Sequence, residues 1–175
     1  MLKAWDWFGA VVQRFNVFLG YVAALLIIVS TLAISYEVVW RYLFHQPHDW
    51  NLEFNIFMLI AATFLAAAHT QMKRGHVGIE VLDGLLSARW KRRRRLLSDI
   101  LSLLFCAFVT VYVWKHFHQA WEGGWVSNST WAPKEWIPYA FMGFGMTTLC
   151  LQLLVQIGDD LLHPTAAVEH DVVGE

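Results

Sequence analysis

The sequence predicts an all-α integral membrane protein with four transmembrane helices, and three observations support this fold class. The 175 residues are 57% apolar and only 15% charged, whereas a soluble domain carries about a quarter charged residues. The apolar residues are concentrated in four long stretches, and most basic residues lie in one connecting segment. With 13 basic and 14 acidic residues, the chain lacks the basic excess of nucleic-acid-binding proteins, so we expect no nucleic-acid partner.

Each of the four apolar stretches is almost free of charge and is predicted to be one span: residues 17–36, 54–72, 96–114 and 136–157. A helix rises about 1.5 Å per residue, so each stretch would be about 30 Å long, the thickness of the bilayer hydrocarbon. Helices are expected because backbone polar groups in lipid must be satisfied within the segment. A soluble bundle is the alternative, but its helices would carry a polar face. We therefore expect residues 1–175 to form a single four-helix transmembrane domain.

The distribution of Lys and Arg predicts the orientation. Eight of them lie between the second and third spans: Lys73, Arg74, Arg89, Lys91, Arg92, Arg93, Arg94 and Arg95. The first connection holds only Arg41, and the third holds Lys115 and Lys134. Basic connections stay on the cytoplasmic side, so we expect both termini in the cytoplasm and the first and third connections outside.

The basic connection also predicts a short amphipathic helix. Apolar residues recur at helical spacing from Ile79 to Trp90, and Glu80, Asp83 and Ser87 fall on the opposite face. Such a helix would lie in the membrane surface, and a protein contact is the alternative. At the N-terminus the apolar run is too long for a cleavable signal, so we expect it to be a permanent span.

The ten tryptophans lie near the ends of the predicted spans, where the ring finds apolar surroundings and its N–H finds a partner. Seven are on the predicted outer side: Trp40, Trp50, Trp114, Trp121, Trp125, Trp131 and Trp136. This number exceeds what an interfacial belt requires. A docking surface for an extracytoplasmic partner is therefore a second interpretation.

Charged residues at the span ends are interpreted as structural. Glu37 and Arg41 are four residues apart after the first span and can pair on one helix face. Asp49 and Glu53 open the second span, where negative charge suits a helix N-terminus. We expect no catalytic residue and no enzymatic activity.

Eight histidines raise the alternative of a membrane redox subunit of the cytochrome b type. Such a subunit needs two histidines at the same depth. His69 lies near the inner end of the second span and His116 beyond the outer end of the third, so most of the bilayer separates them. The remaining outer histidines lack the thiol or carboxylate companions of a typical metal site. We expect no cofactor and no metal.

Small residues four apart let membrane helices approach closely. Gly20 and Ala24 have this spacing in the first span, and Ala62 and Ala66 in the second. These faces serve either packing within the chain or contact with another protein, and the sequence leaves both open. The four residues are our candidates for a partner interface.

The segment from residue 40 to residue 80 resembles a known family. It reads W-R-Y-L-F at 40–44, D-W-N-L-E at 49–53 and H-T-Q-M-K-R-G-H-V-G-I-E at 69–80. This pattern is similar to that of the small membrane subunit of TRAP transporters, the DctQ-like family. A later segment with Trp125, Ser127 or Ser129, Pro133 and Trp136 also fits. Position 51 departs from the pattern, because Asn stands where an acidic or small polar residue is common, and we give it no weight.

The resemblance implies a function in transport. TRAP transporters import organic acids and related solutes into bacteria with a sodium gradient. A periplasmic solute-binding protein captures the solute, and a large permease subunit in the inner membrane carries it. The small subunit would bind the large one as a static scaffold, a role that suits a rigid four-helix bundle. A self-sufficient four-span channel or carrier is a further alternative.

The motif positions of the family would then be structural in this chain. They are Arg41, Trp50, Glu53, Arg74 and His76. We expect them to fix the ends of the spans and the interface with the large subunit.

Overall fold

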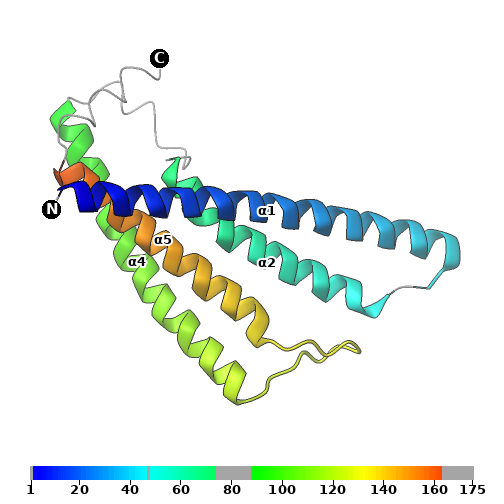
Figure 1. Cartoon of the computed structure of the whole chain (residues 1–175). Helices are drawn as coiled ribbons and strands as arrows, with labels where there is room; N and C mark the ends of the chain where they lie inside the picture. Colours follow the sequence, from blue (N-terminus) through cyan, green and yellow to red (C-terminus); the bar gives the residue numbers. More distant parts are fainter. Residues whose placement is uncertain (1, 47, 74–87, 163–175) are drawn as a thin grey trace.

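The computed structural model describes residues 2–46, 48–73 and 88–162. It contains the helices α1 (Leu2–Phe44), α2 (Asp49–Met72), α4 (Ala88–Glu122) and α5 (Trp136–Leu162) (Figure 1). Each helix contains one predicted span and is long and apolar enough to cross a membrane. The predicted all-α fold with four spans is confirmed.

The helices extend beyond the predicted spans. α1 has 43 residues, which makes it about 64 Å long, roughly twice the thickness of the hydrocarbon. α4 has 35 residues and takes up the basic run Lys91–Arg95 in its first turns. The reason is that charged residues end an apolar stretch without ending a helix, since Lys, Arg and Glu are good helix formers. The predicted amphipathic helix falls mostly on residues 74–87, outside the described residues.

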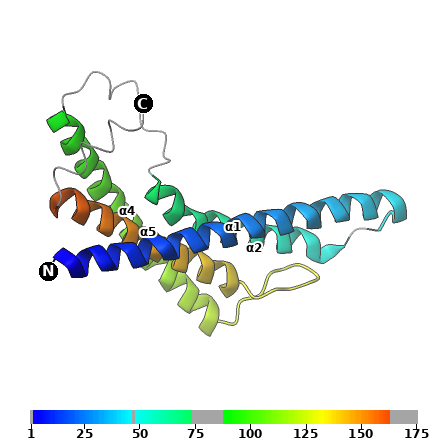
Figure 2. The same cartoon turned by 45° about the horizontal axis from the view of Figure 1, so that its top comes forward.

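The four helices form a row in the order α1, α2, α5, α4 (Figure 1). α2 and α5 occupy the two inner positions, and α1 contacts α5 over a short length. We call the end with the α1–α2 turn and the α4–α5 loop (residues 123–135) the loop end, and the opposite end the terminal end. The two hairpins lie close at the terminal end and diverge toward the loop end (Figure 2). The expected bundle is therefore an open row.

The buried core is small and lies between α1 and α2. Its main cluster consists of Leu19, Ala23, Ala62 and Leu65, with Phe141 of α5 packed against them, and further buried apolar residues such as Leu153 and Val155 lie on α5. Large apolar side chains instead point outward, and α4 alone exposes Leu104, Phe105 and Phe108 by more than 60% each. An apolar surface of this extent would promote aggregation in water, so it belongs in lipid or against a partner.

The contact between α2 and α5 depends on one glycine. A Cβ atom built on Gly145 would overlap the backbone carbonyl of Phe64 and lie 2.8 Å from its Cβ atom. Only a residue without a side chain permits this approach of the two helix backbones. Gly145 therefore fixes the point at which the two hairpins meet.

Candidate functional site

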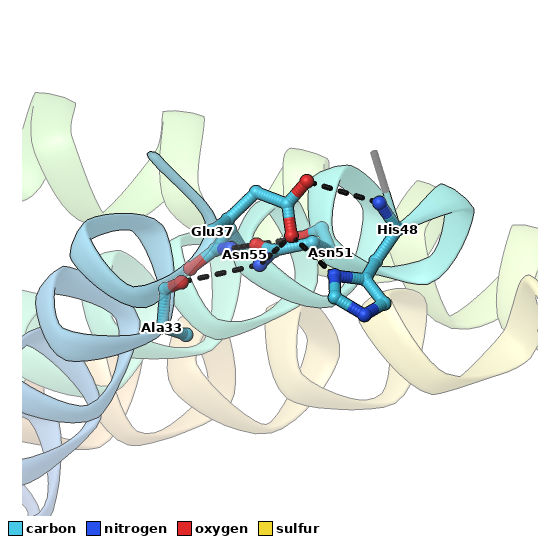
Figure 3. Close-up of polar contacts among 5 residues, drawn as sticks. All are labelled: Ala33, Glu37, His48, Asn51 and Asn55. Atoms are coloured by element: carbon cyan, nitrogen blue, oxygen red, sulfur yellow. Dashed lines mark hydrogen bonds and ion pairs between the residues drawn. The ribbon is translucent and has the colours of Figure 1, made fainter. Parts of the chain in front are cut away.

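Polar side chains of the helices form bonds that join one helix to another, and the first cluster closes the α1–α2 turn (Figure 3). The Glu37 carboxylate accepts a hydrogen bond from the His48 backbone N–H at 3.0 Å, and the His48 Nδ1 atom lies 2.8 Å from its other oxygen. The Asn51 side-chain amide donates to that same oxygen at 3.3 Å and to the Ala33 carbonyl at 3.1 Å. One carboxylate of α1 thereby holds both the turn and the first residues of α2.

This arrangement corrects the expected pairing of Glu37 with Arg41. Both oxygens of the carboxylate are occupied by groups from the start of α2. Among the residues that the structure describes, no ion pair joins the two side chains. The turn holds His48 in place next to Glu37, so His48 is favoured over Arg41 as its partner. An exposed pair such as Glu37 and Arg41 on one helix would contribute only about 0.2–0.5 kcal/mol.

The same cluster continues into the spans. The Asn55 amide donates to the backbone carbonyl of Asn51 at 2.7 Å and contacts the Asn51 side-chain oxygen. The Ser30 hydroxyl of α1 donates to the Asn55 side-chain oxygen at 2.7 Å. All three side chains are at most 5% exposed. Asn51, to which we gave no weight from the sequence, therefore lies at the centre of the α1–α2 junction.

A second group of bonds ties the α4–α5 loop to α2. Glu53 receives the Ser129 hydroxyl at 2.6 Å on one oxygen and the Ser127 hydroxyl on the other. The loop is closed on itself, since the Glu135 backbone N–H donates to the Trp125 carbonyl at 3.0 Å. The bonds to Glu53 therefore connect the two hairpins at the end where the helices diverge. Glu53 and the two loop serines, more than seventy residues apart along the chain, come together here.

A third group joins three helices nearer the terminal end. The Asn16 side-chain amide of α1 donates to Gln152 of α5 at 2.7 Å. One turn later, Gln156 exchanges two bonds with Gln71 of α2, both at 2.9 Å. Gln152 and Gln156 are 1% and 6% exposed. α5 thus presents one amide to α1 and one to α2.

At the terminal end, α1 and α5 are joined by Trp5. Its indole N–H donates to the Asp159 carboxylate at 2.9 Å. A Cβ atom on Gly158 would overlap the Trp5 ring, so the ring lies directly against the α5 backbone. The long N-terminal part of α1 is thereby fixed to the last turns of α5.

The four small residues predicted for a partner interface have different surroundings in the structure. A Cβ atom on Gly20 would lie 2.8 Å from Cγ of His69, so Gly20 faces α2. Ala62 is 2% exposed within the core, and Ala66 packs against that core. Ala24 is exposed. Three candidates therefore serve packing within the chain, and Ala24 remains available to a partner.

The positions that carry the family resemblance also lie in different parts of the structure. Glu53 holds the α4–α5 loop, and Arg41 is exposed near the end of α1. Trp50 is 37% exposed and its ring contacts those of His48 and Phe54. The predicted sites Arg74 and His76 lie outside the described residues.

Our sequence reasoning missed the uncharged polar residues because it searched the spans for ionisable groups. A usable signal was present, since Asn51 and Asn55, and likewise Gln152 and Gln156, are amides four residues apart. This spacing puts two amides on one helix face. In an apolar segment such a face must meet hydrogen-bonding partners.

These polar clusters are suited to a structural role, which is to hold the helices in place. Amide, hydroxyl and carboxylate groups of these clusters form helix–helix and helix–loop bonds, and the buried Asn16 Oδ1 atom has no partner among the described residues. Within the described ranges, no three His, Cys, Asp or Glu side chains gather in a way that could hold a metal ion.

Comparison with known proteins indicates the class of protein to which this chain is similar. A family model described as tripartite ATP-independent periplasmic transporters, DctQ component, matches residues 30–163. The C4-dicarboxylate TRAP transporter small permease protein DctQ of Vibrio cholerae serotype O1 is 25% identical over 170 residues, which cover 85% of this chain and 73% of that protein. The region matched by the family model contains both the α1–α2 cluster and the residues that bind the α4–α5 loop.

Proposed function

Because this chain belongs to the DctQ component family of tripartite ATP-independent periplasmic (TRAP) transporters, we propose that it is the fixed frame on which the large permease subunit is mounted. The chain is a small permease component with four apolar helices, a membrane protein and not an enzyme. The family assignment favours transport over the membrane cytochrome considered from the sequence.

For the solute, the coupling ion and the binding protein, we propose what the sequence led us to expect. The complex would import an organic acid or related solute with sodium, and a periplasmic binding protein would deliver the solute. The relative from Vibrio cholerae is named for C4-dicarboxylates, which are one such class. The basic start of α4 supports an inner-membrane orientation with both termini in the cytoplasm.

The observation that carries the frame proposal is the bonding between neighbouring helices. Buried side chains join α1 to α2, α1 to α5 and α2 to α5. Each such bond contributes on the order of 0.6 kcal/mol in a membrane protein. Since they lie at different depths, together they oppose both sliding and rotation of the helices.

Cross-linking tests whether the chain is static during transport. Asn16 and Gln152 would be replaced by cysteines in a background with Cys106 and Cys150 changed to Ala, and joined by a short bifunctional thiol reagent. The complete three-component transporter would be reconstituted in liposomes. If the chain is a frame, solute uptake after cross-linking stays within about twofold of uptake before it.

The control is the same double-cysteine chain without the reagent, which separates the effect of the substitutions from that of the link. A large loss of uptake only after cross-linking would show that α1 and α5 move against each other, and the frame role would be wrong. Uptake by this chain alone in liposomes would also contradict the proposal.

For the interface with the large subunit, we propose the exposed side of α1 around Ala24, in the middle of the helix and about 15 Å along the axis from Ile34. Ala24→Leu adds bulk where a close helix contact would form, so less large subunit should co-purify. Ala107→Leu is the matched control, because Ala107 is an exposed alanine of α4. Equal recovery of the large subunit with both variants would remove this side of α1 from the interface.

A further inference from the structure

An open hollow of about 280 Å³ lies on α1 near its loop end, lined by Val38, Arg41, Tyr42 and His45. The spacings of three and four residues put these side chains on one flank of the helix. The flank is about a quarter of a turn from Glu37, which faces α2. The hollow therefore opens beside the α1–α2 contact and not into it.

The charge in this hollow is not compensated within the described part of the chain. The carboxylate four residues before Arg41 is occupied by His48 and Asn51. No described side chain bonds the Arg41 guanidinium. An exposed arginine at the end of an apolar span is suited to a phosphate, whose oxygens match the planar fork of N–H donors.

The neighbours of Arg41 add donors at the same level. Tyr42 is 81% exposed, so its hydroxyl is open to a ligand. The His45 backbone N–H bonds the Arg41 carbonyl at 3.0 Å, and His45 adopts a left-handed conformation with φ of 57°. This conformation ends the helix and keeps His45 at the hollow, so that a guanidinium, a phenol and an imidazole lie together.

The surface toward the middle of the span is apolar. Ile34 and Ile27 continue the same flank and are 45% and 48% exposed. The hydroxyl of Thr31 between them donates to the Ile27 carbonyl at 2.8 Å, so it presents no unsatisfied group. A cationic site thus lies next to an apolar strip on the same flank, which matches the order of headgroup and acyl chain in a phospholipid.

We propose that this flank of α1 binds a membrane phospholipid, with the phosphodiester on Arg41 and Tyr42 and an acyl chain along Ile34 and Val38. A free phosphate would use the hollow and make no contact with the apolar strip. A carboxylate of the large subunit is the competing occupant for Arg41, but it would not require the strip. The proposal does not depend on the frame role or on the orientation of the chain.

A lipid titration of the purified, delipidated full-length chain tests the proposal. Thermal stability would be followed while phosphatidylglycerol, diacylglycerol or inorganic phosphate is added. We expect phosphatidylglycerol to stabilise the chain, and we expect little effect of diacylglycerol, which lacks the phosphate, or of phosphate, which lacks the chains. Arg41→Gln should weaken phosphatidylglycerol binding about tenfold.

Lys115→Gln is the matched control, because Lys115 is an exposed cation near the loop end of α4. It should leave lipid binding unchanged, and the melting temperature without lipid verifies that both variants fold. Equal lipid binding by Arg41→Gln and the original chain would overturn the proposal, as would equal stabilisation by phosphate alone. Loss of the large subunit from Arg41→Gln with lipid binding intact would assign Arg41 to a protein partner instead.

Discussion

Replacing Gly145 by alanine tests whether one close backbone contact holds the two hairpins together. The added Cβ atom would overlap the Phe64 carbonyl group. Backbone atoms cannot rotate aside as a side chain can, so α2 and α5 must separate. Overpacking of this kind costs about 1–3 kcal/mol, while the better helix propensity of alanine returns up to about 1 kcal/mol.

Because the overlap in Gly145→Ala is with backbone atoms, the upper part of the overpacking range, about 2–3 kcal/mol, applies, and subtracting about 1 kcal/mol for helix propensity leaves a net loss of about 1–2 kcal/mol. At about 2–4 °C per kcal/mol for a chain of this size, the melting temperature should fall by roughly 2–8 °C. The fluorescence of the ten tryptophans reports unfolding of the full-length chain in detergent micelles during a temperature ramp.

Gly9→Ala is the matched control. Its added Cβ atom would lie 3.5 Å from Val155 Cγ1, an ordinary van der Waals distance. The control should melt at the same temperature as the original chain or slightly above it. If Gly145→Ala melts as high as Gly9→Ala, the close approach of α2 and α5 does not constrain the fold, and our explanation of the crossing is wrong.

Three further predictions concern the polar contacts. Glu53→Ala removes the acceptor of two loop serines, so amide hydrogen exchange in the α4–α5 loop should accelerate about tenfold. The exchange rate of Glu53→Gln should fall between those of the original chain and Glu53→Ala. An unchanged rate in Glu53→Ala would contradict the contact. Asn51→Leu removes the amide that bonds both Glu37 and the Ala33 carbonyl, while Glu37 keeps its bonds from His48. It should lower the free energy of unfolding by about 1–3 kcal/mol, measured by the same thermal ramp. Trp5→Phe loses both the bond to Asp159 and the part of the indole that packs on Gly158, so it should cost more than the roughly 0.6 kcal/mol of one hydrogen bond in a membrane protein; an unchanged melting temperature would show that this contact does not hold α1 to α5.

The placement of the candidate residues shows where sequence reasoning was limited. Gly20 and Ala24 are equivalent in spacing and size, yet one faces His69 of α2 and the other is exposed. A pattern on one helix gives a face but not its neighbour. Likewise, the pairing of Glu37 followed the nearest opposite charge along the helix, and a histidine across the turn proved to be the partner.

The family motifs were visible in the sequence, but their physical meaning was not. Glu53 and the loop serines are more than seventy residues apart along the chain. Their contact depends on how the α4–α5 hairpin is set against α1–α2. That angle depends in turn on the contact of Gly145 with Phe64, which no local pattern contains.

The amino-acid sequence alone determined that the chain is helical, crosses the membrane four times and resembles the small subunit of a TRAP transporter. These features are local, because the bilayer thickness sets the span length and the lack of water forces each span to satisfy its own backbone. Only the tertiary structure decided that the helices form an open row and that amides and serines join them. Such contacts depend on the relative rotation and crossing of helices, which arise when side chains from distant segments pack together.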